Sequence, residues 1–409
     1  MKLFYGWVIV GAGVVITCIG LGTIFALGVF LQPMSTAMGW SRTGISTAAL
    51  LNFLCMGAGS FLWGALSDRF GTRAVVLCGG LLLGIGLMAA SHAGSLLQFQ
   101  LSFGAVAGLA AGSFYAPLTA TATRWFTKHR SLAVALVTAG TGIGSMTVAP
   151  LARWLITSYD WRTAMLVIGA LAWVVITPVS FLVRSPPPVS TSAGAGTQAN
   201  ADDPGFTVAR ALRTPQFAAI ALTFFACCAA HSGPIFHMVS NAIDCGVGAM
   251  TAAVVFGTAG LAALCGRVVF GLVADRVGAK GTMLVGLTIQ AVAIYLYLFA
   301  REPSSFYALS LVFGLAYGGV MPLYAILVRE YFGARIMGAV FGAVAMASTL
   351  GMAIGPWAGG WLYDRFASYS WLYIASFGVG LGAVAVAFTF RAPRPLLAAP
   401  PTPSVATGT

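Results

Sequence analysis

The feature that most constrains this chain is a series of twelve long apolar segments, separated by short breaks rich in charged or turn-forming residues. Most approach or exceed the roughly 20 residues that an α-helix needs to cross a bilayer. The segments are residues 5–32, 43–67, 74–91, 97–122, 131–156, 162–184, 214–240, 250–274, 281–300, 304–328, 337–359 and 370–391. Only 7% of the residues are charged, against about 25% in soluble domains. The sequence therefore predicts an all-α membrane protein with twelve transmembrane helices and excludes a soluble enzyme.

Basic residues are spread unevenly over the breaks, and their distribution predicts the orientation. With the N-terminus in the cytoplasm, fifteen of the 21 Lys and Arg residues fall on the cytoplasmic side and five on the outer side. Cytoplasmic loops carry such an excess. We therefore expect an integral protein of a bacterial inner membrane with both termini inside. The bias explains the net charge of +12 without a nucleic-acid partner. The first apolar run is too long for a signal peptide and is interpreted as a membrane helix.

The composition gives no sign of a cofactor, a metal or an enzymatic site. The seven cysteines form no CxxC pair, and all except Cys245 lie inside apolar segments. Such thiols pack as small hydrophobic residues. The sequence has no HExxH metal motif and no clustered nucleophile and base. An intramembrane enzyme is therefore a poor alternative, and we expect no cofactor and no metal.

The two halves of the chain repeat one another. The stretch Gly64–Arg73 (GALSDRFGTR) recurs as Gly271–Lys280 (GLVADRVGAK), 207 residues later. Pro150 likewise matches Pro356, 206 residues later. Two six-helix halves related by a pseudo-twofold axis along the membrane normal enclose a cavity between them. The predicted division is an N-terminal half (1–184), a cytoplasmic linker (185–213) with a short helix near its end, a C-terminal half (214–391) and a disordered tail (392–409).

These motifs resemble those of the major facilitator superfamily. The GxLxDRxG stretch is typical of that superfamily, and its second copy is present. Three stretches resemble the monocarboxylate transporter and oxalate–formate antiporter branch, bacterial lactate transporters included. With the segments numbered in chain order, they are Trp125-Phe126 leading into helix 5 (131–156), Pro234-Ile-Phe-His237 on helix 7 (214–240) and Arg267-Val-Val-Phe-Gly271 on helix 8 (250–274). The resemblance implies the twelve-helix major facilitator fold, transport by alternating access, and an Arg on helix 8 that holds the substrate carboxylate.

Arg267 is the main candidate for substrate binding. An Arg inside a membrane segment costs about 2.5–3.5 kcal/mol on insertion scales, so it is expected to face an aqueous cavity. Its planar guanidinium matches a carboxylate with two hydrogen bonds. The alternative is that Arg267 reaches the cytoplasmic interface or pairs with Asp275.

His237 and Asp244 are the candidates for proton coupling. They are two helical turns apart and share a face about 10 Å apart if the helix continues. His237 is also a candidate substrate contact. The alternative is an interfacial His with an ordinary loop Asp. His231 points elsewhere, and we interpret it as a packing residue.

Hydroxyl groups near the middle of the membrane are further candidates. Ser113, Tyr115 and Tyr317 could offer polar contacts to a substrate, or else their hydroxyls could bond to neighbouring backbone. The repeated motif supplies residues that resemble the superfamily's conformational cluster, in which the arginines would pair with acids across the interface between the halves. These residues are Gly64, Asp68, Arg69, Gly71 and Arg73, with Asp275 and Arg276 in the second copy.

Charge balance favours a monocarboxylate such as lactate or pyruvate. Helix 11 has no Lys or Arg, unlike the oxalate–formate antiporters, so one fixed cation balances one anionic charge. The helix-8 Asp of animal monocarboxylate transporters is replaced by Ala263, and so proton symport and exchange both stay open. The rival functions are a dicarboxylate exchanger, a multidrug exporter, and a receptor or scaffold. A monomer suffices for this architecture.

Overall fold

The structure is a computed structural model that describes residues 4–126, 130–184, 207–333 and 336–390. In these ranges the chain forms helices and no strands. Twelve helical segments are long and apolar enough to span a membrane. The all-α, twelve-helix prediction is therefore confirmed.

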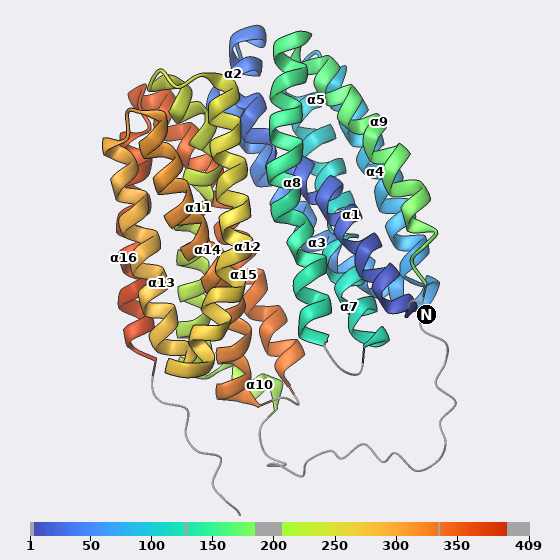
Figure 1. Ribbon diagram of the computed structural model, residues 1–409, viewed down its shortest axis with the longest axis vertical. Helices are drawn as coiled ribbons and strands as arrows, with labels where there is room; N and C mark the ends of the chain where they lie inside the picture. Colours follow the sequence, from blue (N-terminus) through green and yellow to red (C-terminus); the bar gives the residue numbers. More distant parts are fainter. Residues whose placement is uncertain (1–3, 127–129, 185–206, 334–335, 391–409) are drawn as a thin grey trace, which may run out of the picture.

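The helices form two bundles, shown in Figure 1 with the first in blue to green and the second in yellow to red. The first contains α1 (Tyr5–Phe25), α2 (Leu27–Met38), α3 (Arg42–Phe70), α4 (Thr72–Ser91), α5 (Leu96–Phe99), the π-helix η1 (Gln100–Ala107), α6 (Gly108–Ala111), α7 (Tyr115–Trp125), α8 (Arg130–Ser158) and α9 (Trp161–Ser180). The second contains α11 (Pro215–Asp244), α12 (Ala249–Val277), α13 (Ala279–Leu296), the 3-10 turn η2 (Tyr297–Phe299), α14 (Pro303–Phe332), α15 (Met337–Phe366) and α16 (Ser370–Phe388).

The connection between the bundles agrees with the sequence where it is described. The predicted short helix is present as α10 (Val208–Leu212), and its N-cap Thr207 accepts a hydrogen bond from the Arg210 amide. Residues 185–206 of the predicted linker and the tail 392–409 lie outside the described residues. In Figure 1 the start of α1 and the helix α10 are at the same end of the bundles. We call the opposite end, where α2, α11 and α15 finish, the distal end.

The internal repeat is visible in the contacts of its basic residues. Arg73, at the start of α4, donates from Nε to the carbonyl of Val183 (3.2 Å) and from Nη2 to that of Phe181 (3.0 Å). Lys280, at the start of α13, donates to the carbonyls of Phe388 and Phe390. Each acceptor pair lies 207 residues from its counterpart, at the end of α9 or α16. Each cation thus satisfies carbonyls that a helix end leaves unpaired.

Those contacts correct the expectation that the motif arginines pair with acids across the bundles. Arg73 binds a helix end within its own bundle. Arg69 is exposed and lies against the neighbouring Phe70 ring. Asp275 and Arg276 are exposed as well. The physical reason is that backbone carbonyls at a helix end already provide the negative charge that Arg73 needs.

The bundles meet along helix pairs that cross between them. α3 packs on α15, α8 on α12, and α2 on α11. Small residues allow these approaches: a Cβ on Gly142 of α8 would lie 2.7 Å from the carbonyl oxygen of Gly260 on α12. Close backbone contact through small residues is typical of membrane helices. The candidate functional residues Arg267 and Arg42 lie along these seams.

Candidate functional site

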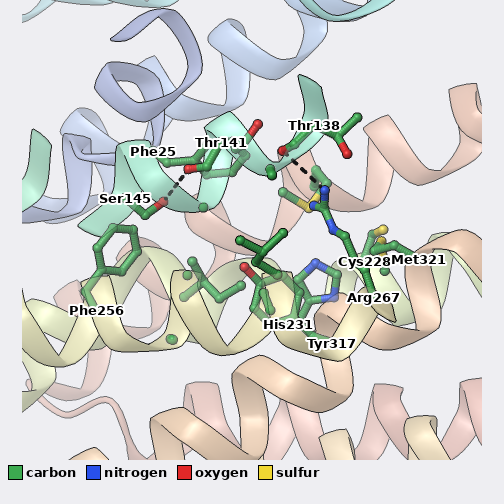
Figure 2. A pocket seen from close by; sticks show the side chains of 18 of the residues that line it. Phe25, Thr138, Thr141, Ser145, Cys228, His231, Phe256, Arg267, Tyr317 and Met321 are labelled. Carbon is green, nitrogen blue, oxygen red and sulfur yellow. Dashed lines mark hydrogen bonds between the residues drawn. The ribbon is translucent and has the colours of Figure 1, made fainter. Parts of the chain in front are cut away.

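A cavity of about 200 Å³ lies between the two bundles near the middle of the helices. Figure 2 shows it from close by, with side chains from both bundles around it. Its polar and aromatic lining comes from α8 (Thr138, Thr141, Ser145), α11 (Phe224, Cys228, His231), α12 (Phe256, Arg267), α14 (Tyr317) and α15 (Ser348), together with Phe25 at the end of α1. The repeat therefore encloses a central cavity.

Arg267 of α12 lines this cavity, and only part of its guanidinium is hydrogen-bonded. Nη1 donates to the carbonyl oxygen of Thr138 across the seam (3.3 Å), as Figure 2 shows. Nε is buried without a partner, and Nη2 makes no hydrogen bond to the described residues. The Nε and Nη2 hydrogens lie along one edge of the planar group. That edge is the fork that accepts two carboxylate oxygens.

The alternative roles considered for Arg267 are absent from the described residues. Asp275 is exposed near the end of α12 and forms no ion pair with Arg267. The guanidinium instead bonds to α8 of the other bundle. Arg267 is therefore a cavity residue, as the cost of placing Arg in a membrane segment predicts.

Tyr317 and His231 form the wall beside Arg267. Their rings are 5.2 Å apart, and both side chains line the cavity. The His231 Nδ1 faces the Cys227 sulfur at 3.9 Å, so the ring is positioned from its own helix. The packing role expected for His231 is thus incomplete, because the ring also forms part of the cavity wall. Its place beside the Tyr317 ring could not be inferred from its spacing to His237.

The Thr138, Ser145 and Ser348 hydroxyls in the cavity are bonded to their own helices. Thr138 donates to the Ala135 carbonyl, and Ser145 donates to that of Thr141. None of the described residues that line the cavity is Asp or Glu. With neutral His231, the cavity wall therefore carries one positive charge, on Arg267.

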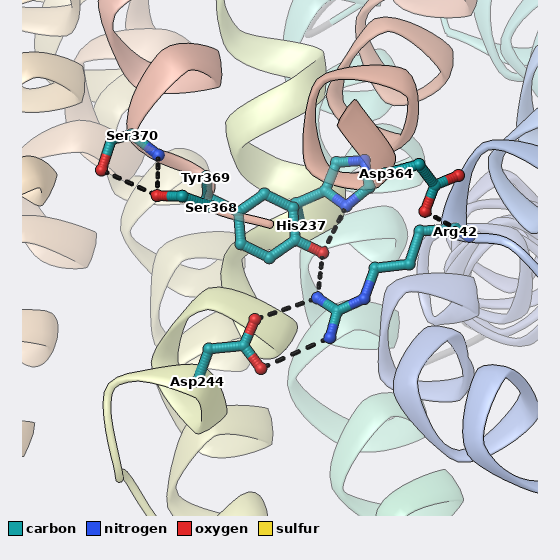
Figure 3. Close-up of polar contacts among 7 residues, drawn as sticks. All are labelled: Arg42, His237, Asp244, Asp364, Ser368, Tyr369 and Ser370. Carbon is teal, nitrogen blue, oxygen red and sulfur yellow. Dashed lines mark hydrogen bonds and ion pairs between the residues drawn. The ribbon is translucent and has the colours of Figure 1, made fainter. Parts of the chain in front are cut away.

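A polar network closes the distal end of the seam (Figure 3). Arg42, the first residue of α3, forms an ion pair with Asp244 at the end of α11, with Nη1–Oδ2 3.0 Å. Its Nη1 also donates to the Tyr369 hydroxyl at 2.6 Å. The guanidinium lies over the Tyr363 ring, 3.5 Å from the centroid. Asp364 accepts hydrogen bonds from the Arg42 and Thr43 amides. An acid from one bundle thus caps a helix of the other.

His237 is the inner end of this network. Its Nε2 lies 2.9 Å from the Pro356 carbonyl oxygen, and its Nδ1 lies 3.1 Å from the Tyr369 hydroxyl. A carbonyl can only accept, so Nε2 carries the proton. Burial raises the pKa of Tyr369, so its hydroxyl stays protonated at neutral pH, although Arg42 opposes that shift. A neutral His237 then accepts from Tyr369, which accepts from Arg42.

His237 and Asp244 are linked only through Tyr369 and Arg42. Asp244, Arg42, Tyr369 and His237 form one chain of contacts. Sequence spacing placed His237 and Asp244 on one face, but it gave no sign of the two bridging residues. The sequence repeats Ser158-Tyr159 as Ser368-Tyr369, 210 residues later, but Tyr369 is 2% exposed and Tyr159 is 67% exposed, so the repeat alone could not reveal this role.

The remaining predicted substrate contacts are distributed as follows. Tyr317 lines the cavity, as expected. Ser113 is fully buried and donates to the Ala110 carbonyl, so its hydroxyl is used by backbone. Tyr115 is 49% exposed on α7 and does not line the cavity. His237 is fully buried in the distal network and does not line it either. The direction of these side chains was not predictable from their position in the sequence.

Comparisons with known proteins give the family. The sequence profile of the Major Facilitator Superfamily matches residues 12–280 and 233–407. Monocarboxylate transporter 13 of Bos taurus is 28% identical over 374 residues, covering 91% of this chain and 86% of that protein. Monocarboxylate transporter 11 of Mus musculus is 29% identical over 380 residues, covering 90% and 83%.

A bacterial relative and a solved structure agree with this assignment. The uncharacterized MFS-type transporter YhjX of Escherichia coli K12 is 24% identical over 345 residues, covering 83% of this chain and 84% of that protein. The crystal structure of a bacterial homologue of the human lysosomal transporter Spinster has the same fold, with a TM-score of 0.77 at 16% identity over 95% of this chain and 97% of that one. The chain belongs to the Major Facilitator Superfamily and is a membrane transporter rather than an enzyme, similar over most of its length to monocarboxylate transporters.

Proposed function

We propose that this transporter carries small monocarboxylates of the lactate and pyruvate type. The observation that supports this most strongly is the free Nε/Nη2 edge of Arg267 in the central cavity. An unpaired donor edge inside a membrane protein is costly unless a ligand provides acceptors. A carboxylate provides two in the matching geometry. The relatives named as monocarboxylate transporters are consistent with this cargo.

The size and charge of the cavity support one carboxylate rather than two or a drug-sized solute. Its volume of about 200 Å³ is below the roughly 300–1,000 Å³ typical of sites for drug-sized ligands. A second carboxylate would find no second fixed cation among the described lining residues and would lose its hydration uncompensated. Dicarboxylate exchange and export of amphiphilic drugs are therefore the weaker candidates.

Alternating access follows from the two-bundle architecture. We place the distal end on the outside of the membrane, because the opposite end carries the excess of basic residues that is typical of the cytoplasmic side. The contacts of Arg42 with Asp244 and Tyr369 then close the outer entrance. Opening outward requires the two bundles to separate there, and so those contacts have to break in every transport cycle.

His237 offers a route for proton coupling in this scheme. A protonated His237 would donate from Nδ1 and could no longer accept from the Tyr369 hydroxyl. The imidazolium would also face Arg42 across Tyr369, with Asp364 and Asp244 as the nearby acids. Protonation would therefore loosen the outer closure and favour loading of the anion from outside. Exchange without protons is the alternative, favoured by the lack of a carboxylate in the cavity.

Transport by purified protein in liposomes tests the cargo. We expect uptake of labelled L-lactate that unlabelled pyruvate inhibits and that succinate or oxalate inhibits weakly. The Arg267→Ala variant should abolish uptake, and Arg365→Ala, which removes an exposed Arg elsewhere, should not. Uptake that survives Arg267→Ala would contradict the proposal. If the rate of lactate counterflow is the same with and without a pH gradient, exchange is favoured over proton symport.

A further inference from the structure

A second cavity lies at the distal end of the C-terminal bundle and shares no lining residue with the central one. Its volume is about 650 Å³, and it lies between the end of α11, η2 and the connection from α15 to α16. Asn241, Asp244, Tyr297, Arg301 and Tyr373 contribute its polar wall. We call it the distal pocket. The proposed transport uses two of its lining residues, Asp244 and Tyr369, in the outer closure, but assigns no ligand to the pocket.

Three buried polar groups of the distal pocket are incompletely hydrogen-bonded. The Tyr373 hydroxyl faces the Asn241 side chain and the Tyr297 hydroxyl faces Ser310, but neither hydroxyl nor the Asn241 Nδ2 forms a hydrogen bond of full geometry within the described structure. These side chains are 8%, 1% and 1% exposed. Buried donors without acceptors are rare because desolvating them is unfavourable. Three such groups along one cavity wall point to an acceptor-bearing molecule that fills it.

Arg301 gives the distal pocket a positive charge. Its Nη1 donates to the carbonyls of Leu298 (3.0 Å) and Ala300 (2.8 Å), which fixes the guanidinium at the rim. Burial raises the pKa of the nearby Cys245 thiol, and the charge of Arg301 opposes that rise. Asp244, the acid of the pocket wall, is already paired with Arg42. The distal pocket therefore keeps one unpaired positive charge, that of Arg301.

We propose that the distal pocket binds a small organic monoanion, with its carboxylate on Arg301 and its other acceptor atoms on the Asn241 amide and the two phenols. Asp244 and Tyr369 belong both to this pocket and to the network that closes the distal end. A bound anion therefore contacts the residues that hold the bundles together there. The proposal does not depend on which solute crosses the membrane.

Calorimetric titration with L-lactate and acetate tests the distal pocket without interference from the central one. The full-length Arg267→Gln variant, which lacks the central cation, should still bind one equivalent of anion. Adding Arg301→Gln should weaken that binding about tenfold or more, because a charge-assisted hydrogen bond is lost. The matched change Arg365→Gln removes an exposed Arg that does not line the pocket, and it should leave binding unchanged.

Alkylation of Cys245, which lines the pocket, gives an independent reading. L-Lactate should slow its reaction with N-ethylmaleimide in both the wild type and Arg267→Gln, while exposed Cys78 on α4 keeps its rate. If Arg267→Gln binds no anion, or if Arg301→Gln behaves like Arg365→Gln, the pocket holds water only and the proposal is wrong. Protection that disappears with Arg267→Gln would assign the effect to the central cavity and also overturn it. If the wild-type protein does not transport lactate but still binds an anion at the distal pocket, only the proposed transport is contradicted.

Discussion

Removal of the Asp244 carboxylate should open the distal end of the transporter. In the Asp244→Asn variant, Arg42 loses the carboxylate that its two terminal nitrogens contact at 3.0 and 3.4 Å. The Arg42 side chain is only 9% exposed, so little water can replace that partner. The Asn amide group keeps the shape of the carboxylate but not its charge.

The size of the effect follows from the partners that Arg42 keeps. Removing one member of a buried ion pair costs about 3–5 kcal/mol. Asp244 is 27% exposed, and Arg42 keeps the Tyr369 hydroxyl and the Tyr363 ring. We therefore expect a loss near 2 kcal/mol in the closed conformation, which is roughly 30-fold in the equilibrium between closed and open.

Sided thiol labelling measures that equilibrium. Thr141 lines the central cavity and is half-buried, so Thr141→Cys reports access to it. A membrane-impermeant reagent added to intact cells should label this cysteine about 30-fold faster in Asp244→Asn. The double variant Arg42→Gln/Asp244→Asn should open less than the single variant, because no buried charge is left unpaired. Asp160→Asn is the control, since Asn preserves that helix cap. Equal labelling in Asp244→Asn and wild type would refute the closure argument.

Three further predictions concern the site and the fold. Arg267→Lys keeps a charge but loses the fork, so the half-saturating lactate concentration in liposome uptake should rise about tenfold; unchanged kinetics would exclude bidentate binding. Gly71→Ala and Gly278→Ala should each lower stability by roughly 1–3 kcal/mol in thermal unfolding, because their φ values of 84° and 89° suit glycine alone. Gly64 has open space around it, so Gly64→Ala is the control that should leave stability unchanged. Asp160 caps α9 by accepting a hydrogen bond from the Thr163 amide, and this bond lowers the pKa of Asp160. Asp160→Ala should lower the free energy of unfolding by about 1 kcal/mol at neutral pH, and this loss of stability should disappear as the pH falls through the lowered pKa. A loss that is the same at every pH would argue against the ionised cap.

The fold was predictable because its main determinants are local. Segment length and composition identified the twelve spans, and the recurrence of Gly71 as Gly278 identified the repeat, since both positions adopt the same glycine-only backbone. Details within the spans were less predictable. The first span breaks at Ala26 into α1 and α2, and the fourth contains the π-helix η1. Both irregularities depend on how neighbouring helices pack, which composition does not record.

From the sequence, a site residue could be predicted only where placing it inside the membrane is energetically unfavourable. Arg267 and its cavity followed from the cost of a charge inside the membrane. Placing Ser113 and Tyr115 inside the membrane has little energetic cost, because a hydroxyl can bond to the backbone of its own helix. The direction of their side chains therefore depended on packing. Arg42 lies just before the predicted segment 43–67, and nothing in the sequence distinguished it from other loop cations. Its role depends on contacts with α11, with α15 and with Tyr369 in the connection between α15 and α16, and only the tertiary structure brings these together.

A structure determined with L-lactate bound is the most direct test of the transport site. The account predicts ligand density in the central cavity, with both carboxylate oxygens about 2.7–2.9 Å from Nε and Nη2 of Arg267. The Nη1 contact with the Thr138 carbonyl should persist beside it. Lactate bound elsewhere in the cavity, with the Nε/Nη2 edge still unoccupied, would contradict the account.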